Sequence, residues 1–382
     1  MRTYDVAIIG GGIIGTSIAF ELAAEKLSVV VVDRKEPGRE ASWAAAGMLS
    51  PAPDSARDLP LVPFARESLR RYPEFIEDIQ DGSGKRTNYV RDGAFEVFVS
   101  ADAERECDER LSELRGLGIS VEPLTGGAAR QIDRAIGASI RAALWLREEG
   151  SVEPHLLMDA VLTAAGNRGV EIRAGCEVTG LIREGDRCTA LIARGEKIVA
   201  QHIVMAAGCF SGEVARDSWL KLLVPTRPVP GQMIALRPQG EAPSVRRVTR
   251  SEQGYLLPRS DGRIVAGSTI EEARFDKRVT AAGLNKILES AFAISPELSG
   301  AEVIESWAGL RPGTPDDLPI LGPADCQGLW IATGHYRSGI LLAPATAKLF
   351  RHWIVRANSD ADVAAFSPLR FARPEMRAQT AL

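Results

Sequence analysis

The sequence has little that would mark a disulfide framework, a zinc site or a membrane span. Its five cysteines lie far apart, with no C-x-x-C pair and no histidine close by: Cys107, Cys176, Cys188, Cys209 and Cys326. This spacing does not fit the usual zinc motifs, so we predict free thiols in a reducing compartment and no metal site. No run of about 18 apolar residues occurs, so no transmembrane helix is predicted.

A signal peptide and a basic surface are lacking as well. The apolar stretch Val6–Phe20 follows Asp5 and is interrupted by glycines, which is not typical of a signal peptide, so we expect a cytoplasmic protein. Lys and Arg number 46 against 50 Asp and Glu, which gives a formal net charge of -4. Such a chain offers no basic field for phosphate backbones or anionic lipids, so neither nucleic acid nor a membrane is an expected partner.

The composition that remains is that of a globular protein. Hydrophobic residues make up 45% and charged residues 25%, which is enough for a buried core. A length of 382 residues exceeds what one core usually supports, so we predict two domains. We also expect a homo-oligomer, either a dimer or a tetramer.

The N-terminal residues show the pattern of a strand, a tight turn, a helix and a second strand. Asp5–Ile9 is a short β-rich run, Ile13–Ala24 has helical spacing, and Ser28–Val32 is rich in valine. This order predicts a βαβ unit in a parallel sheet that is covered on both faces.

Later segments continue this pattern and add a second one. A helix is predicted over Glu153–Arg168, followed by short strands that form a β-meander, and the chain ends with a strand and a helix. These runs are Val170–Arg173, Glu177–Arg183, Arg187–Ala193, Lys197–Ala200, Ile203–Ala206 and Leu329–Ala332, with the last helix over Ile340–Val355. Alternating runs within Tyr89–Val99 and Arg227–Gly267 predict an antiparallel sheet.

The predicted fold class is α/β. A Rossmann-type nucleotide-binding domain, with a parallel sheet and a β-meander, is combined with an antiparallel α+β substrate domain. We expect the first domain to comprise residues 1–88, 141–220 and 325–372, and the second to comprise residues 89–140 and 221–324. Residues 373–382 are expected to form a loosely held tail.

A glycine-rich turn supplies the clearest functional signal. Gly10, Gly12 and Gly15 form a G-x-G-x-x-G pattern between the first strand and the first helix, and Asp33 ends the second strand. In such motifs the glycines permit the turn, the approach of a pyrophosphate and close packing of helix on strand, and the acid binds a ribose hydroxyl. We predict a dinucleotide site, with a glycine-rich turn and a surface Asp as the alternative. The motif does not separate FAD from NAD.

The run Glu40–Ser50 consists largely of small residues. Close approach by a large flat ligand and a small-residue helix packed under a sheet explain this composition equally well. Spacing alone does not decide between them.

Four segments resemble the glycine oxidases of thiamine biosynthesis, within the D-amino-acid oxidase and sarcosine oxidase superfamily. They are Gly10–Asp33, Ala41–Met48, Trp307–Asp316 and Gly334–Pro344, which together span nearly the whole chain. The first is common to many flavoproteins, whereas the last two are specific to this group. The resemblance implies FAD rather than NAD.

The same resemblance implies where the cofactor would lie. Ser42 and the small residues after it would follow the pyrophosphate and the flavin, Val178 would contact the adenine side through its backbone, and the Gly334–Leu341 turn would face the flavin ring. The implied cofactor-binding residues are Gly10, Gly12, Ile13, Ile14, Gly15, Asp33, Arg34, Ser42, Ala45, Ala46, Gly47, Met48, Val178, Ala207, Gly208, Arg311, Gly334, Tyr336, Arg337, Ser338, Gly339, Ile340 and Leu341.

The resemblance also implies three catalytic residues. Arg311 would pair bidentately with the substrate carboxylate, Tyr255 would give that carboxylate a second hydrogen bond, and Arg337 would line the same pocket. By residue type alone each has a structural alternative: an arginine before a proline is more often a surface residue, and a tyrosine in a strand is half in the core. His335 is by default a packing residue rather than a base.

Several positions depart from the wider superfamily. Trp43 stands where a small polar residue is usual and Gln253 where a histidine occurs, and either could reshape the mouth of the pocket. Sarcosine oxidases commonly have a lysine near position 270 and a cysteine near the Arg311 loop that binds the flavin covalently. Here position 270 is Ile270, and the nearest cysteine, Cys326, lies well past the loop. These differences favour glycine oxidase and non-covalent FAD.

The implied reaction is oxidation of glycine or another small amino acid. A hydride leaves Cα for the flavin, O2 takes up the electrons as hydrogen peroxide, and the imine yields glyoxylate and ammonia or enters thiazole synthesis. Three alternatives remain open: an oxidase of sarcosine or of a larger N-substituted glycine, a flavin dehydrogenase with another electron acceptor, and a flavin-binding subunit without turnover.

Overall fold

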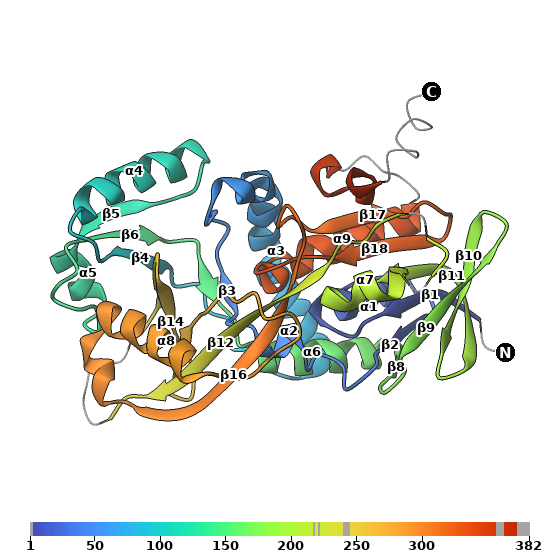
Figure 1. Ribbon diagram of the computed structural model, residues 1–382, viewed down its shortest axis with the longest axis horizontal. Coiled ribbons are helices and arrows are strands. Elements are labelled where there is room, and N and C mark those ends of the chain that lie inside the picture. The colour runs from blue at the N-terminus through green and yellow to red at the C-terminus, as the bar shows by residue number, and fades with distance from the viewer. Residues whose placement is uncertain (1–2, 217, 221, 240–244, 357–362, 373–382) are drawn as a thin grey trace.

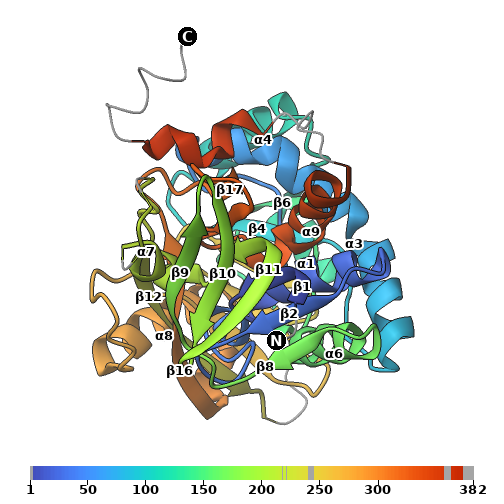
Figure 2. The same cartoon turned by 90° about the vertical axis from the view of Figure 1, so that its right-hand side faces the viewer.

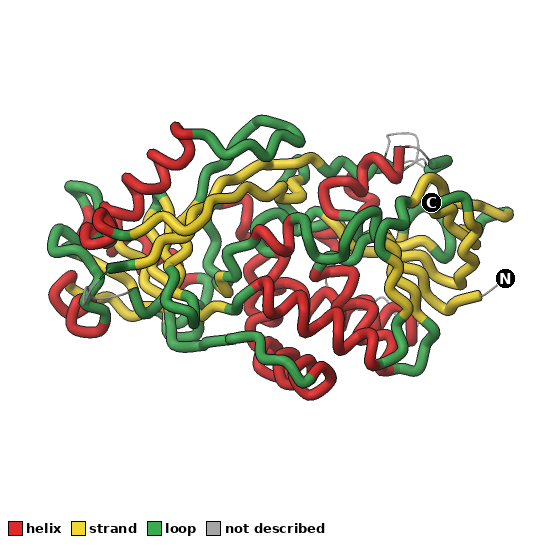
Figure 3. Tube along the Cα trace, turned by 90° about the horizontal axis from the view of Figure 1, so that it is seen from below, coloured by secondary structure: helices red, strands yellow, loops and turns green. Residues whose placement is uncertain are grey.

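The computed structural model describes residues 3–216, 218–220, 222–239, 245–356 and 363–372. Two eight-stranded sheets dominate it, and a short pair, β3 (Met48–Leu49) and β7 (Gly150–Ser151), forms a third. The two large sheets lie side by side along the long axis of the molecule (Figure 1). Seen from below, several helices fill the middle of the molecule, with strands toward either end (Figure 3). The predicted α/β class is confirmed.

The first large sheet is the predicted parallel sheet. At its centre β1 (Thr3–Ile9) pairs in parallel with β2 (Val29–Val32) and β11 (Glu196–Met205), and β8 (Glu171–Arg173) and β18 (Leu329–Thr333) extend it in parallel on either side. All four valines of β2 are buried, as expected for a strand covered on both faces.

Alternation along β1 and β2 divides the core into two layers. Val6, Ile8, Val29 and Val31 pack against α1 (Ile13–Ala24), α3 (Val62–Ser83), α6 (Pro154–Asn167) and α9 (Gly339–Arg356). Ala7, Ile9, Val30 and Val32 belong to the core on the opposite face, which includes residues of the β-meander and of α7 (Ser211–Arg216). The sheet is therefore held between two apolar layers.

The β-meander forms from β9 (Val178–Glu184), β10 (Arg187–Ala193) and β11, which pair antiparallel and curve across one end of the molecule (Figure 2). We predicted two separate strands at Lys197–Ala200 and Ile203–Ala206, whereas β11 is continuous. The reason is pairing: the first half of β11 bonds to β10, the second half to β18, and β1 pairs with both halves.

The second large sheet is antiparallel over most of its width, in the order β16-β12-β15-β14-β13-β4-β6-β5, with one parallel pair between β13 and β4. Its members are β4 (Ala94–Phe98), β5 (Glu122–Thr125), β6 (Ala142–Leu146), β12 (Arg227–Arg237), β13 (Val248–Ser251), β14 (Gly254–Pro258), β15 (Ile264–Gly267) and β16 (Glu302–Gly313). Helices α4 (Ala103–Gly116), α5 (Gly126–Ile132) and α8 (Ala281–Ile294) accompany it. None of α3, α4 and α8 was predicted.

Two strands lie on the other side of the predicted domain boundaries. β6, assigned to the first domain, belongs to the second sheet, and β17 (Ile320–Pro323), assigned to the second domain, pairs antiparallel with β18 of the first sheet. Both lie within a few residues of the predicted boundaries at 141 and 325. The division into two domains stays a prediction.

The long strand β16 connects the two halves of the molecule. It pairs with β12 along its length and reaches α2 (Ala41–Ala44) at the centre of the ribbon (Figure 1). There the Trp307 indole N–H donates a hydrogen bond of 3.2 Å to the Ala44 carbonyl. Arg311 lies near the end of the same strand.

Candidate cofactor and substrate site

The glycine-rich turn shows a different need for glycine at each position. Gly10 has φ +106°, and a Cβ there would lie 2.4 Å from the Ala206 carbonyl oxygen; at Gly15 a Cβ would lie 2.0 Å from the Gly10 carbonyl oxygen. At Gly12 a Cβ would meet only the Ser42 hydroxyl, at 3.2 Å, and Gly12 borders a cavity. The fold itself therefore requires Gly10 and Gly15, whereas Gly12 keeps the cavity wall open.

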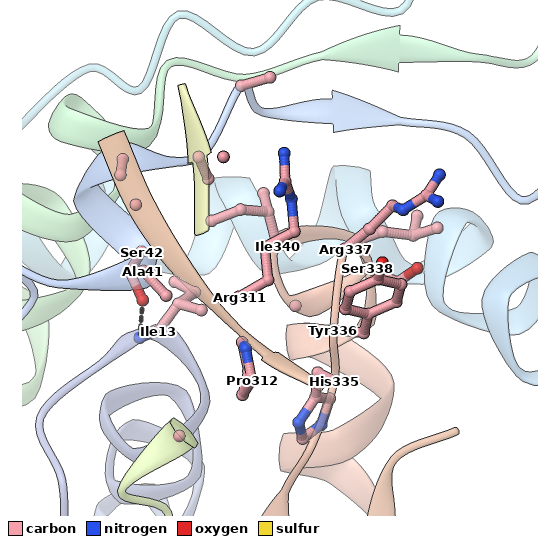
Figure 4. A pocket seen from close by; sticks show the side chains of 18 of the residues that line it. Ile13, Ala41, Ser42, Arg311, Pro312, His335, Tyr336, Arg337, Ser338 and Ile340 are labelled. Atoms are coloured by element: carbon pink, nitrogen blue, oxygen red, sulfur yellow. Dashed lines mark hydrogen bonds between the residues drawn. The ribbon is translucent and has the colours of Figure 1, made fainter. Parts of the chain in front are cut away.

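Side chains from two other segments complete this turn. The first amide of α1, on Ile13, donates to the Ser42 hydroxyl at 2.9 Å (Figure 4). Asp33 accepts from the Gly11 amide at 2.8 Å and from the Lys35 amide at 2.9 Å, and burial raises the pKa of its carboxyl. A ligand would thus find a helix N-terminus and a hydroxyl for its acceptors, and next to them a carboxylate for a donor such as a ribose hydroxyl.

A cavity of about 990 Å³ extends from this turn to β14 and β16. All the predicted site residues line it except Gly15, whose place in the interior allows α1 and β1 to pack closely. The packing role that the motif gives Gly15 is seen here, whereas its listing among the cofactor-binding residues stays a prediction. The open wall at Gly12, the helix N-terminus and the volume fit an elongated dinucleotide such as FAD.

Arg311 is a charged group on the β16 side of the cavity. Its Nη1 donates to the Thr269 carbonyl at 3.2 Å and to the Pro230 carbonyl at 3.4 Å, and its Nη2 donates to the Ser268 hydroxyl at 2.7 Å. Burial lowers its pKa, yet no described carboxylate lies within ion-pair distance. These three bonds leave donors free for a bidentate ligand, since a guanidinium has five.

The other two predicted catalytic residues border the same cavity in different states. The Tyr255 hydroxyl makes no hydrogen bond to the described part of the chain, so it is available to a ligand. Arg337, by contrast, forms an ion pair with Asp54 at 2.5 Å, and although burial opposes it, the charge of Asp54 raises the arginine's pKa. The Arg311 and Tyr255 side chains therefore keep unused hydrogen-bonding groups on the cavity wall, whereas Arg337 is paired with Asp54.

The turn before α9 brings the last predicted segment to the cavity (Figure 4). The Tyr336 amide donates to the Pro312 carbonyl at 3.1 Å, which anchors this turn next to Arg311. His335 is buried, its Nε2 lies 3.2 Å from the Thr346 hydroxyl, and burial lowers its pKa to about 3. With so low a pKa the imidazole is a poor proton acceptor near neutral pH, which fits a packing role in the turn.

The structure differs from the sequence-based picture at Trp43 and at the cysteines, and agrees with it at Gln253. Trp43 does not line the cavity, because its ring stacks on His155 with centroids 3.6 Å apart; Gln253 does line it. Cys326 was the cysteine considered for a covalent link, but Cys176 and Cys209 are the ones on the cavity wall. Burial raises the pKa of Cys209 to about 12, so its thiol is not a nucleophile near neutral pH.

Sequence reasoning missed a group of charged residues on the cavity wall. Arg110, Arg250, Glu96 and Asp54 line it together with the predicted residues. They occur in ordinary strands, helices and loops at no motif spacing, so the sequence carries no signal that sets them apart from surface charges.

A Rossmann-type sheet and a long cavity that ends at a free arginine define a class: oxidoreductases that combine a dinucleotide with a small anionic substrate. Residues 5–353 match the family model of the FAD dependent oxidoreductases (DAO), and the chain belongs to this family.

Relatives narrow the resemblance further. A glycine oxidase of Pseudomonas putida is 34% identical over 95% of this chain and 98% of its own length. A bifunctional protein ThiO/ThiG of Trichormus variabilis is 34% identical, and this chain spans 56% of that protein. The crystal structure of glycine oxidase from Geobacillus kaustophilus superposes with a TM-score of 0.90 at 31% identity and covers 97% of this chain and 99% of its own. No helix in the described ranges is long and apolar enough to cross a membrane.

Proposed function

We propose that this chain is an FAD-dependent oxidase of glycine and other small amino acids. The observation that carries the proposal is the free, partly buried Arg311 guanidinium at one end of a cavity whose other end is a dinucleotide turn. A substrate carboxylate would supply the missing counter-charge. The similarity to proteins named glycine oxidase supports the choice of substrate.

Bound FAD would supply the hydride acceptor, and the chain would supply its position and that of the substrate. Gly10, Gly12, Ser42 and the start of α1 would hold the pyrophosphate, with Asp33 at the ribose. Arg311 and Tyr255 would fix the substrate carboxylate and so orient the Cα–H bond, which turns a random encounter into an ordered one. Arg337 would lie beside this position but would not bind the substrate carboxylate as long as it is paired with Asp54.

The substrate ammonium must lose a proton before the hydride leaves, and the described turn before α9 offers no base to accept it. His335 is buried, and the burial lowers its pKa, which makes it a poor proton acceptor. We therefore infer that the amine reacts as the free base and that its lone pair stabilises the developing imine. The rate with glycine at subsaturating concentration is expected to rise with pH as the amine deprotonates. A rate independent of pH between about 7 and 10 would contradict this step.

Substrate profiling with a peroxide readout tests the proposal as a whole. Glycine, sarcosine and small D-amino acids are expected to react, with glycine among the best and bulky D-amino acids poor. If only a long N-substituted glycine reacts, the alternative of a biosynthetic intermediate as substrate is correct. Slow reoxidation by O2 with fast reoxidation by an artificial acceptor would indicate a dehydrogenase.

We further propose that the FAD is bound non-covalently, that the oxidation product of the enzyme serves thiazole and thiamine synthesis, and that the protein is a homo-oligomer. The similarity to a ThiO/ThiG fusion supports the pathway. Acid or heat should release the yellow colour as free FAD, and light scattering after size exclusion reports the assembly. Flavin that stays with the denatured polypeptide would contradict the first of these proposals.

A further inference from the structure

The arginines around the substrate end of the cavity differ in how their charge is balanced. Arg250 pairs with Glu149 at 2.5 Å and with Glu96 at 2.9 Å, and Arg110 pairs with Glu96 at 2.9 Å and with Glu113 at 2.6 Å. Both side chains are largely buried, with 9% and 17% of their surface exposed. Each is held between two carboxylates, so neither is available to an anionic ligand.

Arg337 is held by one carboxylate and is more accessible. Its 2.5 Å pair with Asp54 leaves the two side chains 41% and 57% exposed, and both residues line the cavity. The Arg337 guanidinium also lies 5.2 Å from the Tyr336 ring. An accessible single pair is weak compared with a buried network, so removing Asp54 would release this arginine without exposing a buried charge.

We infer that Asp54 makes the site selective for substrates with one carboxylate. Arg311 binds the first carboxylate. Of the arginines Arg110, Arg250 and Arg337, only Arg337 is not held between two carboxylates, so it is the one for which a second carboxylate can compete. Asp54 pairs with that arginine and repels a second negative charge, so it disfavours iminodiacetate (N-carboxymethylglycine) and other dicarboxylates. A competing charge built into a site in this way is a general route to specificity. The inference rests on the proposed function and names its substrate class.

The test replaces Asp54 in the FAD-loaded enzyme. In Asp54→Asn the ratio of kcat/KM for iminodiacetate to kcat/KM for glycine should rise about tenfold or more, because a repulsive charge is removed and Arg337 is released. The double variant Asp54→Asn with Arg337→Met should lose that rise. Glu252→Gln is the matched control: Glu252 is exposed on the cavity wall and forms no described ion pair, so its loss changes the net charge equally without freeing an arginine.

A binding measurement separates this inference from the proposed function. The dissociation constants of malonate and acetate, followed by the perturbation of FAD absorbance, need no turnover. Asp54→Asn should tighten malonate relative to acetate, and again only when Arg337 is present. The inference is overturned if both ratios stay at the parent value in Asp54→Asn, or if they rise equally in the double variant or in Glu252→Gln. Absence of glycine turnover in the parent would overturn the proposed function alone.

Discussion

At the scale of single residues, the most informative one is Arg311, whose charge has no described counter-charge. Three neutral oxygens, on Ser268, Thr269 and Pro230, hold its guanidinium in place. Neutral acceptors fix the geometry but leave the charge uncompensated, and an arginine remains protonated even when burial lowers its pKa. A carboxylate that enters the cavity therefore meets a preorganised and unpaired cation.

Arg311→Met should lower kcat/KM for glycine about 30- to several-thousand-fold, because removing one member of such a pair costs about 2–5 kcal/mol. Arg311→Lys should fall between the parent and the Met variant, since an ammonium keeps the charge but loses the bidentate geometry. Initial rates of peroxide formation over a range of glycine concentrations measure both effects.

An amine of similar size without a carboxylate is the control for this prediction. Its weak oxidation should change little in Arg311→Met, because it never contacts the guanidinium, and FAD content and melting temperature should stay near those of the parent. A variant that oxidises glycine as well as the parent does would show that Arg311 is structural, with Arg337 the next candidate for the carboxylate.

At the scale of elements, the start of α1 separates what the fold needs from what the cofactor needs. Gly12→Val should leave the chain folded but free of FAD, because a side chain at this position meets only the Ser42 hydroxyl and projects into the space of the pyrophosphate. FAD absorbance after purification and the far-UV circular dichroism of the same sample measure the two properties separately.

Gly10→Val is the matched comparison in the same turn. Here a side chain would lie 2.4 Å from the Ala206 carbonyl oxygen, in a backbone conformation of φ +106° that a branched residue rarely adopts. We expect a poorly folded or insoluble protein. Equal loss of folding in the two variants would mean that Gly12 is also required by packing.

At the scale of the whole molecule, His335 links stability to pH. Its folded-state pKa is about 3, against an ordinary value of 6.5, so below pH 6.5 the unfolded chain binds a proton that the folded chain does not. The His335 contribution to the free energy of unfolding is complete above pH 6.5 and should decrease by up to about 1.4 kcal/mol per unit as the pH falls toward 3.

Denaturant unfolding of the parent and of His335→Gln at several pH values between 4 and 7 would measure this contribution. Glutamine keeps a hydrogen-bonding group near Thr346 but does not titrate, so the difference between the two proteins isolates the histidine from the carboxylates. The gap in stability should narrow as the pH falls. A gap that is constant across this range would mean that His335 titrates normally in the folded protein.

Local pattern was sufficient to predict the first strands and the glycine-rich turn of the nucleotide half of the fold. Alternation and valine content predicted β1 and β2, and the glycine spacing predicted the turn, because a buried parallel strand and a pyrophosphate turn impose their composition on neighbouring residues. The helix α3 was missed, and Pro73 within it interrupts the helical pattern that the sequence would otherwise show. The continuous β11 was missed because two of its three pairing partners, β1 and β18, are distant in the sequence.

The sequence by itself thus determined the class of fold, the position of the turn and, through family motifs, the residues that meet at one cavity. It did not determine the state of those residues. Arg337 is paired because Asp54, 283 positions before it in the chain, folds against it, whereas no described carboxylate folds against Arg311. Trp43 turns away from the cavity because its ring stacks on His155. The charge available to a substrate is set by which groups fold against one another, and only the tertiary structure decides that.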